Sequence, residues 1–373
     1  MRIALTGASM LMLGTMAAHA GGIERTPQSI VPLFEQGRYG EFSFKRVSPS
    51  VSGVGGLVTP GADSGNMAPD YSNFGFAYKA DINDTWSYAV IYDQPYGTDV
   101  DYPTGTGYFA QGSTAEFDSN ALTAVLQYNF DTNISIYGGL RYQTVSADAF
   151  IPFASPVPGV TPPYDVNGDR DGAFGYLVGA SYERPEIAMR VSLTYNSGID
   201  HSLSTTENSV IGVNQKSKTE INTPESVNLE FQSGVAKDTL VFGSVRWVNW
   251  SEFQISPADY VLITGGTPLA FFADDRTTFT LGVGRKLSEQ WSVAASVRYE
   301  RSTGSPTGNL GPTDGLLGLT LSASYTMDKM KITGGISYTD VGDADTIVGT
   351  AIPGGIFKGN DAVAIGVRVG YYF

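Results

Sequence analysis

The chain has 373 residues, a net charge of −14, 45 glycines, 21 tyrosines and no cysteine. Only 16% of the residues are charged, a composition that disfavours the Leu-, Ala-, Glu- and Lys-rich helices of soluble proteins. The acidity argues against a nucleic-acid partner, because binding to phosphates depends on clustered Lys and Arg. The lack of cysteine excludes disulfide frameworks and thiolate metal sites.

Residues 1–20 are typical of a secretory signal peptide. A positive start at Arg2 is followed by an apolar stretch and by the small-x-small cleavage signal Ala18-His19-Ala20, so the mature chain is expected to begin at Gly21. A buried N-terminal helix is the alternative. Beyond Gly21, no apolar run approaches the ~20 residues that a membrane-spanning helix needs. We therefore expect an exported protein without a helical anchor.

The next segment, residues 21–38, is predicted to be a short hatch inside the barrel described below. Thr26-Pro27 is a plausible helix start and Gly37 a stop. Three apolar residues between them would share one side: Ile30, Leu33 and Phe34. The alternative is a frayed periplasmic tail, since chain ends are often poorly ordered.

From residue 39 onward, the sequence alternates with the period of two that marks strands with one apolar and one polar face. In the last strand, Val363 to Phe373 place every second residue on an apolar face, and Arg368 lies on the other. Fourteen such segments are predicted: 39–49, 70–81, 84–94, 116–130, 133–147, 171–184, 187–200, 219–233, 238–252, 275–287, 290–302, 315–327, 330–341 and 360–373.

This pattern predicts an all-β fold, a fourteen-stranded antiparallel transmembrane β-barrel over residues 39–373. Tight turns alternate with long loops, as in bacterial outer-membrane barrels, and the strand number is even. Because an unpaired strand edge is costly in hydrocarbon, strand 39–49 must pair with strand 360–373. A soluble β-sandwich is the alternative. We expect a monomer in the outer membrane, surrounded by lipid and lipopolysaccharide.

Several predicted outer loops are apolar where water-facing loops should be polar, and exposed apolar patches often mark binding sites. We predict that these loops capture a hydrophobic ligand; alternatively, they pack on one another as a lid. The candidate residues are Phe150, Ile151, Phe153, Leu262, Ile263, Phe271, Phe272, Ile352 and Phe357.

The predicted lumen face carries isolated cations among small polar residues. A guanidinium can receive a ligand carboxylate in a bidentate manner. Alternatively, these groups form internal salt bridges with Glu230 and Glu300. The candidates are Arg141, Arg190, Arg246, Arg298 and Arg368.

Metal and catalytic motifs are weak. Residues 165–172 offer acidic and amide oxygens at alternate positions, like a calcium loop, but lack the expected closing glutamate. An Asx-turn before strand 171–184 is therefore the preferred interpretation. His201, in a predicted outer loop beside Ser202 and Ser204, is the sole basis for an outer-membrane lipase. We expect no enzyme activity, no cofactor and no metal.

Two segments resemble a known family: Tyr92-Asp93-Gln94-Pro95-Tyr96-Gly97 and Phe242-Gly243-Ser244-Val245-Arg246-Trp247-Val248-Asn249-Trp250-Ser251. With the fourteen-strand pattern, they are similar to the FadL/TodX (OmpP1) outer-membrane transporters of long-chain fatty acids and other hydrophobic compounds. The resemblance implies a barrel plugged by an N-terminal hatch, capture on apolar outer loops, and lateral release at a kinked third strand. Pro95 is the candidate for that kink, and a plain proline at the start of a loop is the alternative. The hatch lacks the family's Asn-Pro-Ala motif. A hydrophilic porin is the main alternative.

Overall fold

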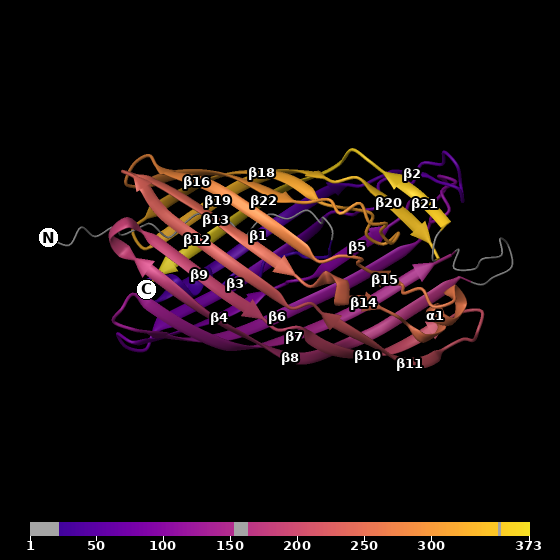
Figure 1. The fold of residues 1–373 in the computed structure, drawn as a ribbon, viewed down its shortest axis with the longest axis horizontal. Helices are drawn as coiled ribbons and strands as arrows, with labels where there is room; N and C mark the ends of the chain where they lie inside the picture. Colours follow the sequence, from indigo (N-terminus) through magenta and orange to yellow (C-terminus); the bar gives the residue numbers. More distant parts are fainter. Residues whose placement is uncertain (1–21, 153–162, 350–351) are drawn as a thin grey trace.

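The computed structural model describes residues 22–152, 163–349 and 352–373, so the predicted signal peptide and Phe153 lie outside the described residues. These residues form a closed antiparallel barrel (Figure 1). Its sheet contains 17 strand segments, and three membrane-crossing strands are each split into two, which gives the fourteen strands predicted. Within the described ranges, no helix is long and apolar enough to span a membrane.

The strands of the barrel have the following bounds: β1 (Tyr39–Ser50), β3 (Tyr71–Asp81), β4 (Trp86–Asp93), β5 (Gly97–Asp101), β6 (Thr114–Asn129), β7 (Ile134–Ile151), β8 (Tyr164–Arg184), β9 (Met189–Asn196), β10 (Ile199–Asn208), β11 (Gln215–Thr223), β12 (Ser226–Ala236), β13 (Thr239–Val248), β16 (Arg276–Lys286), β17 (Trp291–Glu300), β18 (Leu316–Met327), β19 (Met330–Val341) and β22 (Asn360–Tyr372). The remaining elements are η1 (Val31–Phe34), β2 (Gly53–Gly55), η2 (Pro185–Ile187), η3 (Trp250–Glu252), β14 (Gln254–Ile255), α1 (Ala258–Thr264), β15 (Ala270–Phe271), β20 (Ala344–Val348) and β21 (Ile352–Phe357).

The barrel closes as the sequence requires. β1 pairs with β22 over its whole length, from Tyr39 opposite Tyr372 to Ser50 opposite Asp361, and with β3 on its other edge. Backbone groups of the first and last strands therefore satisfy one another, which removes the open edge that hydrocarbon would not tolerate.

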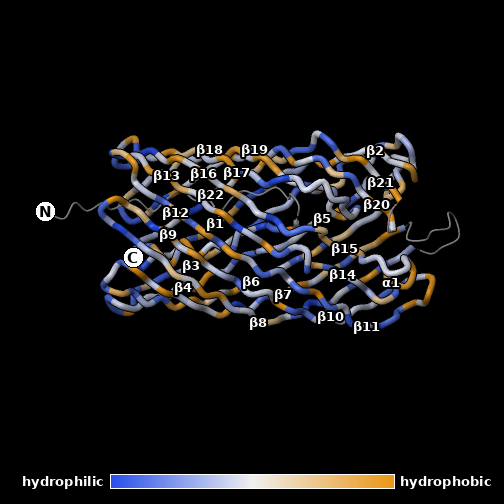
Figure 2. Tube along the Cα trace, in the orientation of Figure 1, coloured by the Kyte–Doolittle hydropathy of each residue, from blue (hydrophilic) through white to orange (hydrophobic). Residues whose placement is uncertain are grey.

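Apolar and polar residues alternate along the strands of the wall, as predicted (Figure 2). On β22, Val363, Ile365, Val367 and Tyr371 are exposed on the outside, whereas Ala362 and Ala364 are buried within. Side chains that face the lumen are mostly small and polar, such as Thr123, Ser192 and Thr194. The apolar exterior is what a lipid solvent selects.

Three strands are interrupted: β4/β5, β9/β10 and β11/β12. Each break lies near a residue that weakens a ladder, namely Pro95, Gly198 and Pro224. A proline cannot donate a ladder hydrogen bond, and a glycine has no side chain to pack. The breaks let one long strand change direction while it stays beside its neighbour, since β4 and β5 both pair with β6.

Three expectations about loops are wrong because β7, β8 and β10 extend farther outward than predicted. Phe150 and Ile151 end β7 instead of opening a loop. Residues 165–172 lie within β8, where they pair with β7, so they form neither a calcium loop nor a turn. His201 lies in β10, and its side chain is buried.

The outer loops form a small packed structure of their own. β2 and β20 flank β21 in a three-stranded sheet. Phe357 of β21 is fully buried there with Tyr102, Tyr108 and Met67. On the opposite side, β14 pairs with β15 next to α1.

Candidate functional site

The N-terminal segment, residues 22–38, packs against inward-facing residues of the wall. Ile30 and Leu33 are buried in one cluster with Ala89, Val125, Tyr137 and Leu177. Phe34 packs beside it, with its ring 5.9 Å from that of Tyr137, and the Arg190 guanidinium lies 4.4 Å from the Phe34 ring centre. All three residues predicted for the hatch therefore contact the barrel interior or its lining.

The same segment is bonded to the break in the third strand. Pro95 O accepts hydrogen bonds from the backbone N–H groups of Arg25 (2.7 Å) and Thr26 (3.2 Å), and Gly97 N–H donates to Ile23 O (2.8 Å). Glu24 and Tyr96 form an isolated antiparallel bridge. Residues 23–26 thus supply backbone partners that the interrupted strand lacks.

Beside this break, the wall has what we call the side opening, bounded by residues 71–75 of β3 and 94–101 of the third strand. β3 pairs with β4 only from Phe76 to Asp81, and in the described part of the chain no ladder joins residues 71–75 to β5. The side chain of Gln94 partly substitutes for it, because its Oε1 accepts from Phe74 N–H at 3.1 Å. From Gln94 toward the outer loops, the β5 part of the third strand is therefore not paired with β3.

The Arg25 side chain lies in the side opening. Its Nη2 is 2.6 Å from Asp99 Oδ2 and its Nη1 is 3.5 Å from Asp118 Oδ1. Its guanidinium also sits 4.7 Å from the ring centre of Tyr71 on β3. A residue of the N-terminal segment therefore joins both edges of the opening.

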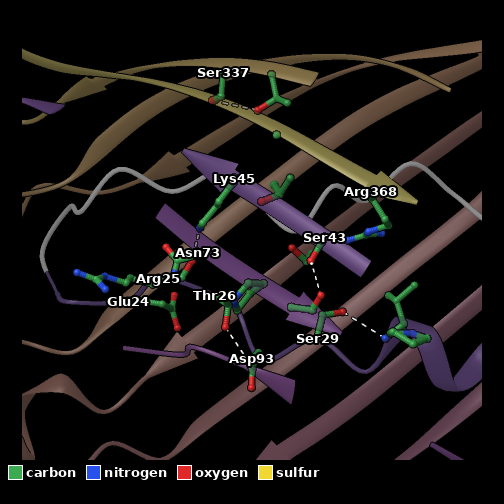
Figure 3. Close-up of a pocket in the computed structure, with 18 of the residues that line it drawn as sticks. Glu24, Arg25, Thr26, Ser29, Ser43, Lys45, Asn73, Asp93, Ser337 and Arg368 are labelled. Atoms are coloured by element: carbon green, nitrogen blue, oxygen red, sulfur yellow. Dashed lines mark hydrogen bonds between the residues drawn. The ribbon is translucent and has the colours of Figure 1, made fainter. Parts of the chain in front are cut away.

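Behind the opening lies the inner cavity, with an empty volume of about 1760 Å³ (Figure 3). The N-terminal segment crosses it: Thr26 Oγ1 donates to Asp93 Oδ2 (2.7 Å), Ser29 Oγ donates to Glu230 Oε1 (2.7 Å), and Lys45 Nζ donates to Arg25 O. The lining includes lumen-facing Ser43 and Gly75. It also includes three residues that are exposed on the outside of the wall: Phe44, Phe74 and Phe76.

The predicted lumen cations differ in their surroundings. Arg246 binds the N-terminal segment, with Nη2 2.5 Å from Glu24 Oε1 and 3.1 Å from Gln28 Oε1. Arg141 Nε donates to Thr123 Oγ1 at 3.0 Å, and Arg190 stacks on Phe34 as described. Arg298 and Arg368 line the inner cavity, and Arg368 Nε lies 3.8 Å from Glu41.

A second, outer cavity of about 780 Å³ lies toward the loops. Phe271 and Phe272 line it together with two aromatic residues that the sequence analysis did not single out, Phe117 and Phe253. Ile23 of the N-terminal segment also lines it, next to Glu24 and Arg25 of the inner cavity. The segment therefore separates the two cavities.

The other predicted loop residues do not gather at this cavity. Leu262 is 71% exposed and Ile352 54% exposed, both at the surface. Ile151 and Ile263 pack in a cluster beside the cavity, and Phe357 is buried in the loop sheet. Phe150 is exposed at the end of β7. Apolar residues in a loop cannot by themselves distinguish packing from ligand contact, because both bury apolar surface.

The sequence analysis missed Arg25 and Glu24, which have no local pattern. Trp250 lay in the motif used for the family resemblance. It is buried between Tyr96 (ring centres 5.5 Å apart) and Phe272 (4.9 Å apart). Trp250 therefore contacts both the break in the third strand and a residue that lines the outer cavity.

No catalytic arrangement forms around His201. Its Nδ1 lies 3.2 Å from Asp171 Oδ2, but its Nε2 lies 3.3 Å from the Gln143 amide oxygen, and Ser202 Oγ donates instead to Glu220. Among the described residues there is no cluster of three or more His, Asp or Glu side chains suited to a metal ion.

A family model described as "outer membrane protein transport protein (OMPP1/FadL/TodX)" matches residues 39–346. The chain belongs to this family. It is therefore an outer-membrane protein of a family that transports hydrophobic compounds, and it does not belong to a family of enzymes. The expected fourteen-stranded barrel, the outer-membrane location and the family are confirmed.

Solved structures show the same fold at low sequence identity. A FadL homologue from Pseudomonas aeruginosa has a TM-score of 0.76 and 15% identity, covering 94% of this chain and 96% of that chain. The toluene transporter TodX of Pseudomonas putida gives 0.66 and 12%, with 95% and 96% covered. The toluene transporter TbuX of Ralstonia pickettii gives 0.63 and 13%, with 95% and 96% covered. A search of curated proteins finds no match.

Proposed function

We propose that this protein takes up a hydrophobic compound through the outer cavity and releases it sideways into the membrane through the side opening. The observation that carries the proposal is the interrupted third strand, whose missing pairing with β3 leaves a passage occupied by Arg25. The inner cavity is lined by Arg25 of this passage and by Asn73 and Gly75 of β3 beside it, so it lies directly behind the opening.

The N-terminal segment acts as the hatch of this route. It contributes Ile23 to the outer cavity and Glu24 and Arg25 to the inner one. A ligand that moves between the cavities must displace residues 23–26 from Pro95 and Gly97. Beyond these three backbone hydrogen bonds, residues 24–26 are held by side-chain hydrogen bonds and ion pairs, a small set compared with the strand ladders around them.

Apolar capture also provides the driving force. A hydrocarbon gains roughly 0.8 kcal/mol per CH₂ on leaving water for an apolar cavity. Release sideways into lipid keeps that gain, whereas release downward into the periplasm would reverse it. Long-chain fatty acids and aromatic hydrocarbons are both candidates, since solved relatives include a FadL homologue and toluene transporters. We further propose that the barrel works as a monomer in lipid and lipopolysaccharide.

Uptake by cells tests this function. Cells that lack their own transporter and express this chain should accumulate radiolabelled oleate or naphthalene faster than cells with an empty vector. Gly75→Phe places a ring at the side opening, where even a Cβ would lie 2.8 Å from Ser43 Oγ, and should slow this uptake several-fold. Gly334→Phe on β19 is the matched control, because a Cβ there meets nothing within 4 Å.

Two outcomes would contradict the proposal. Equal accumulation in expressing and non-expressing cells would remove the transport function. Rapid swelling of proteoliposomes in small sugars would instead support the hydrophilic porin, which needs an open lumen and neither the hatch nor the side opening.

A further inference from the structure

We propose that the outer cavity admits uncharged apolar molecules, aromatic ones above all, and rejects carboxylates, so that the transported compound is a neutral hydrocarbon-like molecule and not a fatty acid anion. This inference rests on the proposed transport function and narrows its substrate class. It concerns the outer cavity, because every ligand arriving from outside must be desolvated there before it meets the hatch.

The outer cavity is lined almost entirely by apolar groups from both the wall and the loops. The wall contributes Phe117, Leu203 and Ile221, and the loops contribute Phe253, Phe272 and Leu310. Apolar walls of this kind suit a small uncharged molecule.

The aromatic side chains are arranged for ring contacts. The Phe117 and Phe253 rings meet edge to face with centres 5.8 Å apart, and the Phe253 and Phe272 rings are tilted at 5.6 Å. Trp250 supports both Phe253 and Phe272 from behind, at 5.6 Å and 4.9 Å. Aromatic rings prefer such edge and offset contacts, so an aromatic ligand can extend the existing array.

Among the described residues that line the cavity, none carries a positive charge to compensate a carboxylate. The only charged residues among its described lining are Glu116 and Asp148, both acidic. Residues 153–162 lie outside the described part of the chain, and their sequence contains no Lys or Arg. One lining hydroxyl, that of Thr205, already donates within the protein, to Thr219 Oγ1 at 2.8 Å.

The cations lie one step deeper, in the inner cavity. Arg25 is paired with Asp99, and Arg246 is paired with Glu24, so these groups hold the hatch. A carboxylate in the outer cavity is therefore separated by the N-terminal segment from the guanidinium groups that line the inner cavity. Burial of an ionised carboxylate without a partner is strongly unfavourable, whereas a neutral ring incurs no such cost.

A pair of ligands with the same ring system tests the selectivity. The full-length protein in lipid nanodiscs is equilibrated with radiolabelled naphthalene or 2-naphthoate at pH 8, and binding to empty nanodiscs is subtracted. Naphthalene is expected to bind at least about tenfold more tightly than 2-naphthoate, because the carboxylate finds no partner. Equal affinities, or tighter binding of 2-naphthoate, would overturn the inference.

A charge introduced into the cavity should reverse the preference. Phe271→Lys, on a lining loop residue that is only partly buried, is expected to raise affinity for 2-naphthoate and lower it for naphthalene. Phe271→Leu is the size-reducing control and should not raise affinity for 2-naphthoate. Leu310→Lys repeats the test from another loop if the first variant fails to fold. An unchanged ratio in folded lysine variants means that the ligands bind elsewhere and refutes the assignment.

Uptake separates this inference from the proposed function. If cells expressing the protein take up neither ligand faster than control cells, the transport function fails. If they take up both equally, transport stands and the charge selectivity is wrong. Faster uptake of naphthalene alone supports both.

Discussion

Glu24 and Arg246 form a close ion pair that joins the N-terminal segment to the wall. Arg246 is buried, Glu24 is only 12% exposed, and Glu24 Oε1 also accepts from Arg246 Nε at 2.7 Å. Removal of one partner leaves the other charge buried without compensation, although Gln28, Ser226 and Asn228 still bind Arg246.

We therefore expect Glu24→Gln to weaken docking of the hatch by about 2 kcal/mol. Hydrogen exchange of the backbone amides of residues 23–34 measures this directly, and exchange should accelerate there while the strand amides stay protected. Glu289→Gln, which alters an exposed pair with Lys286, is the control. Unchanged exchange in the hatch would show that the pair does not hold it.

Asp314 has the corresponding role in the outer loop that follows β17. Its carboxylate accepts from Ser302 Oγ (2.6 Å), Gly304 N–H (2.7 Å) and Arg276 Nη1 (2.5 Å). Burial alone would raise the pKa of Asp314, but these hydrogen bonds together hold the pKa below its usual value. The stabilisation is therefore fully present above the ordinary carboxyl pKa and is lost as the pH falls through the lowered folded value.

Asp314→Asn should destabilise this loop by about 3 kcal/mol at neutral pH, because the amide has one acceptor oxygen and no charge for Arg276. Limited proteolysis of residues 301–315 is the measurement, and the variant should be cut faster at pH 7. The wild-type loop should keep its resistance on acidification to about pH 4. Asp345→Asn, at an exposed position, should behave like the wild type. Identical cleavage of the Asp314 variant and the wild type would contradict this role.

At the scale of elements, the broken third strand and the hatch form one unit. Gly97 begins β5 directly beside Arg25, and a Cβ at residue 97 would lie 2.5 Å from the Arg25 guanidinium carbon. The glycine is needed for this close approach, because any side chain would push Arg25 from Asp99.

Gly97→Ala should therefore loosen Arg25 in the side opening and increase exchange of the Arg25 and Thr26 amides. We also expect faster uptake of the transported compound, since the passage is less firmly occupied. Gly334→Ala is the matched control in a strand with open space around the Cβ. Slower uptake with unchanged exchange would argue that Arg25 assists passage instead of blocking it.

At the scale of the whole molecule, the free energy of unfolding depends on an apolar lipid-facing surface. Leu319 on β18 is exposed on the outer face of the barrel, while Thr320 beside it faces the lumen. A charged residue on the lipid face of a barrel costs about 2–4 kcal/mol near the bilayer centre.

Leu319→Arg is expected to lower the free energy of unfolding in lipid by that amount. Urea titration of the protein in vesicles, followed by the mobility of unheated samples on gels, provides the measurement. Leu57→Arg, in an exposed outer loop, should leave the transition unchanged. Equal stability of Leu319→Arg and the wild type would mean that this face does not contact hydrocarbon.

Much of the barrel could be predicted from the sequence, because lipid outside and a polar lumen inside impose a rule that each residue obeys locally. In β22 and β17, the polarity of each residue alone indicates whether it faces lipid or the lumen. Closure of the barrel follows from the cost of an unpaired strand edge in hydrocarbon. The tight turns at Asn133 and Asp328, which have positive φ, also depend only on local chemistry.

The site was decided by tertiary structure, because its contacts join residues far apart in the chain. Glu24 meets Arg246, and Arg25 meets Asp99, only after the barrel has closed around the N-terminal segment. For the same reason, apolar loop residues that look alike in sequence diverge: Phe272 lines the outer cavity and Phe357 is buried in the loop sheet. Hydrophobicity determines that such a side chain leaves water, and only the surrounding fold determines whether a neighbour or a ligand covers it.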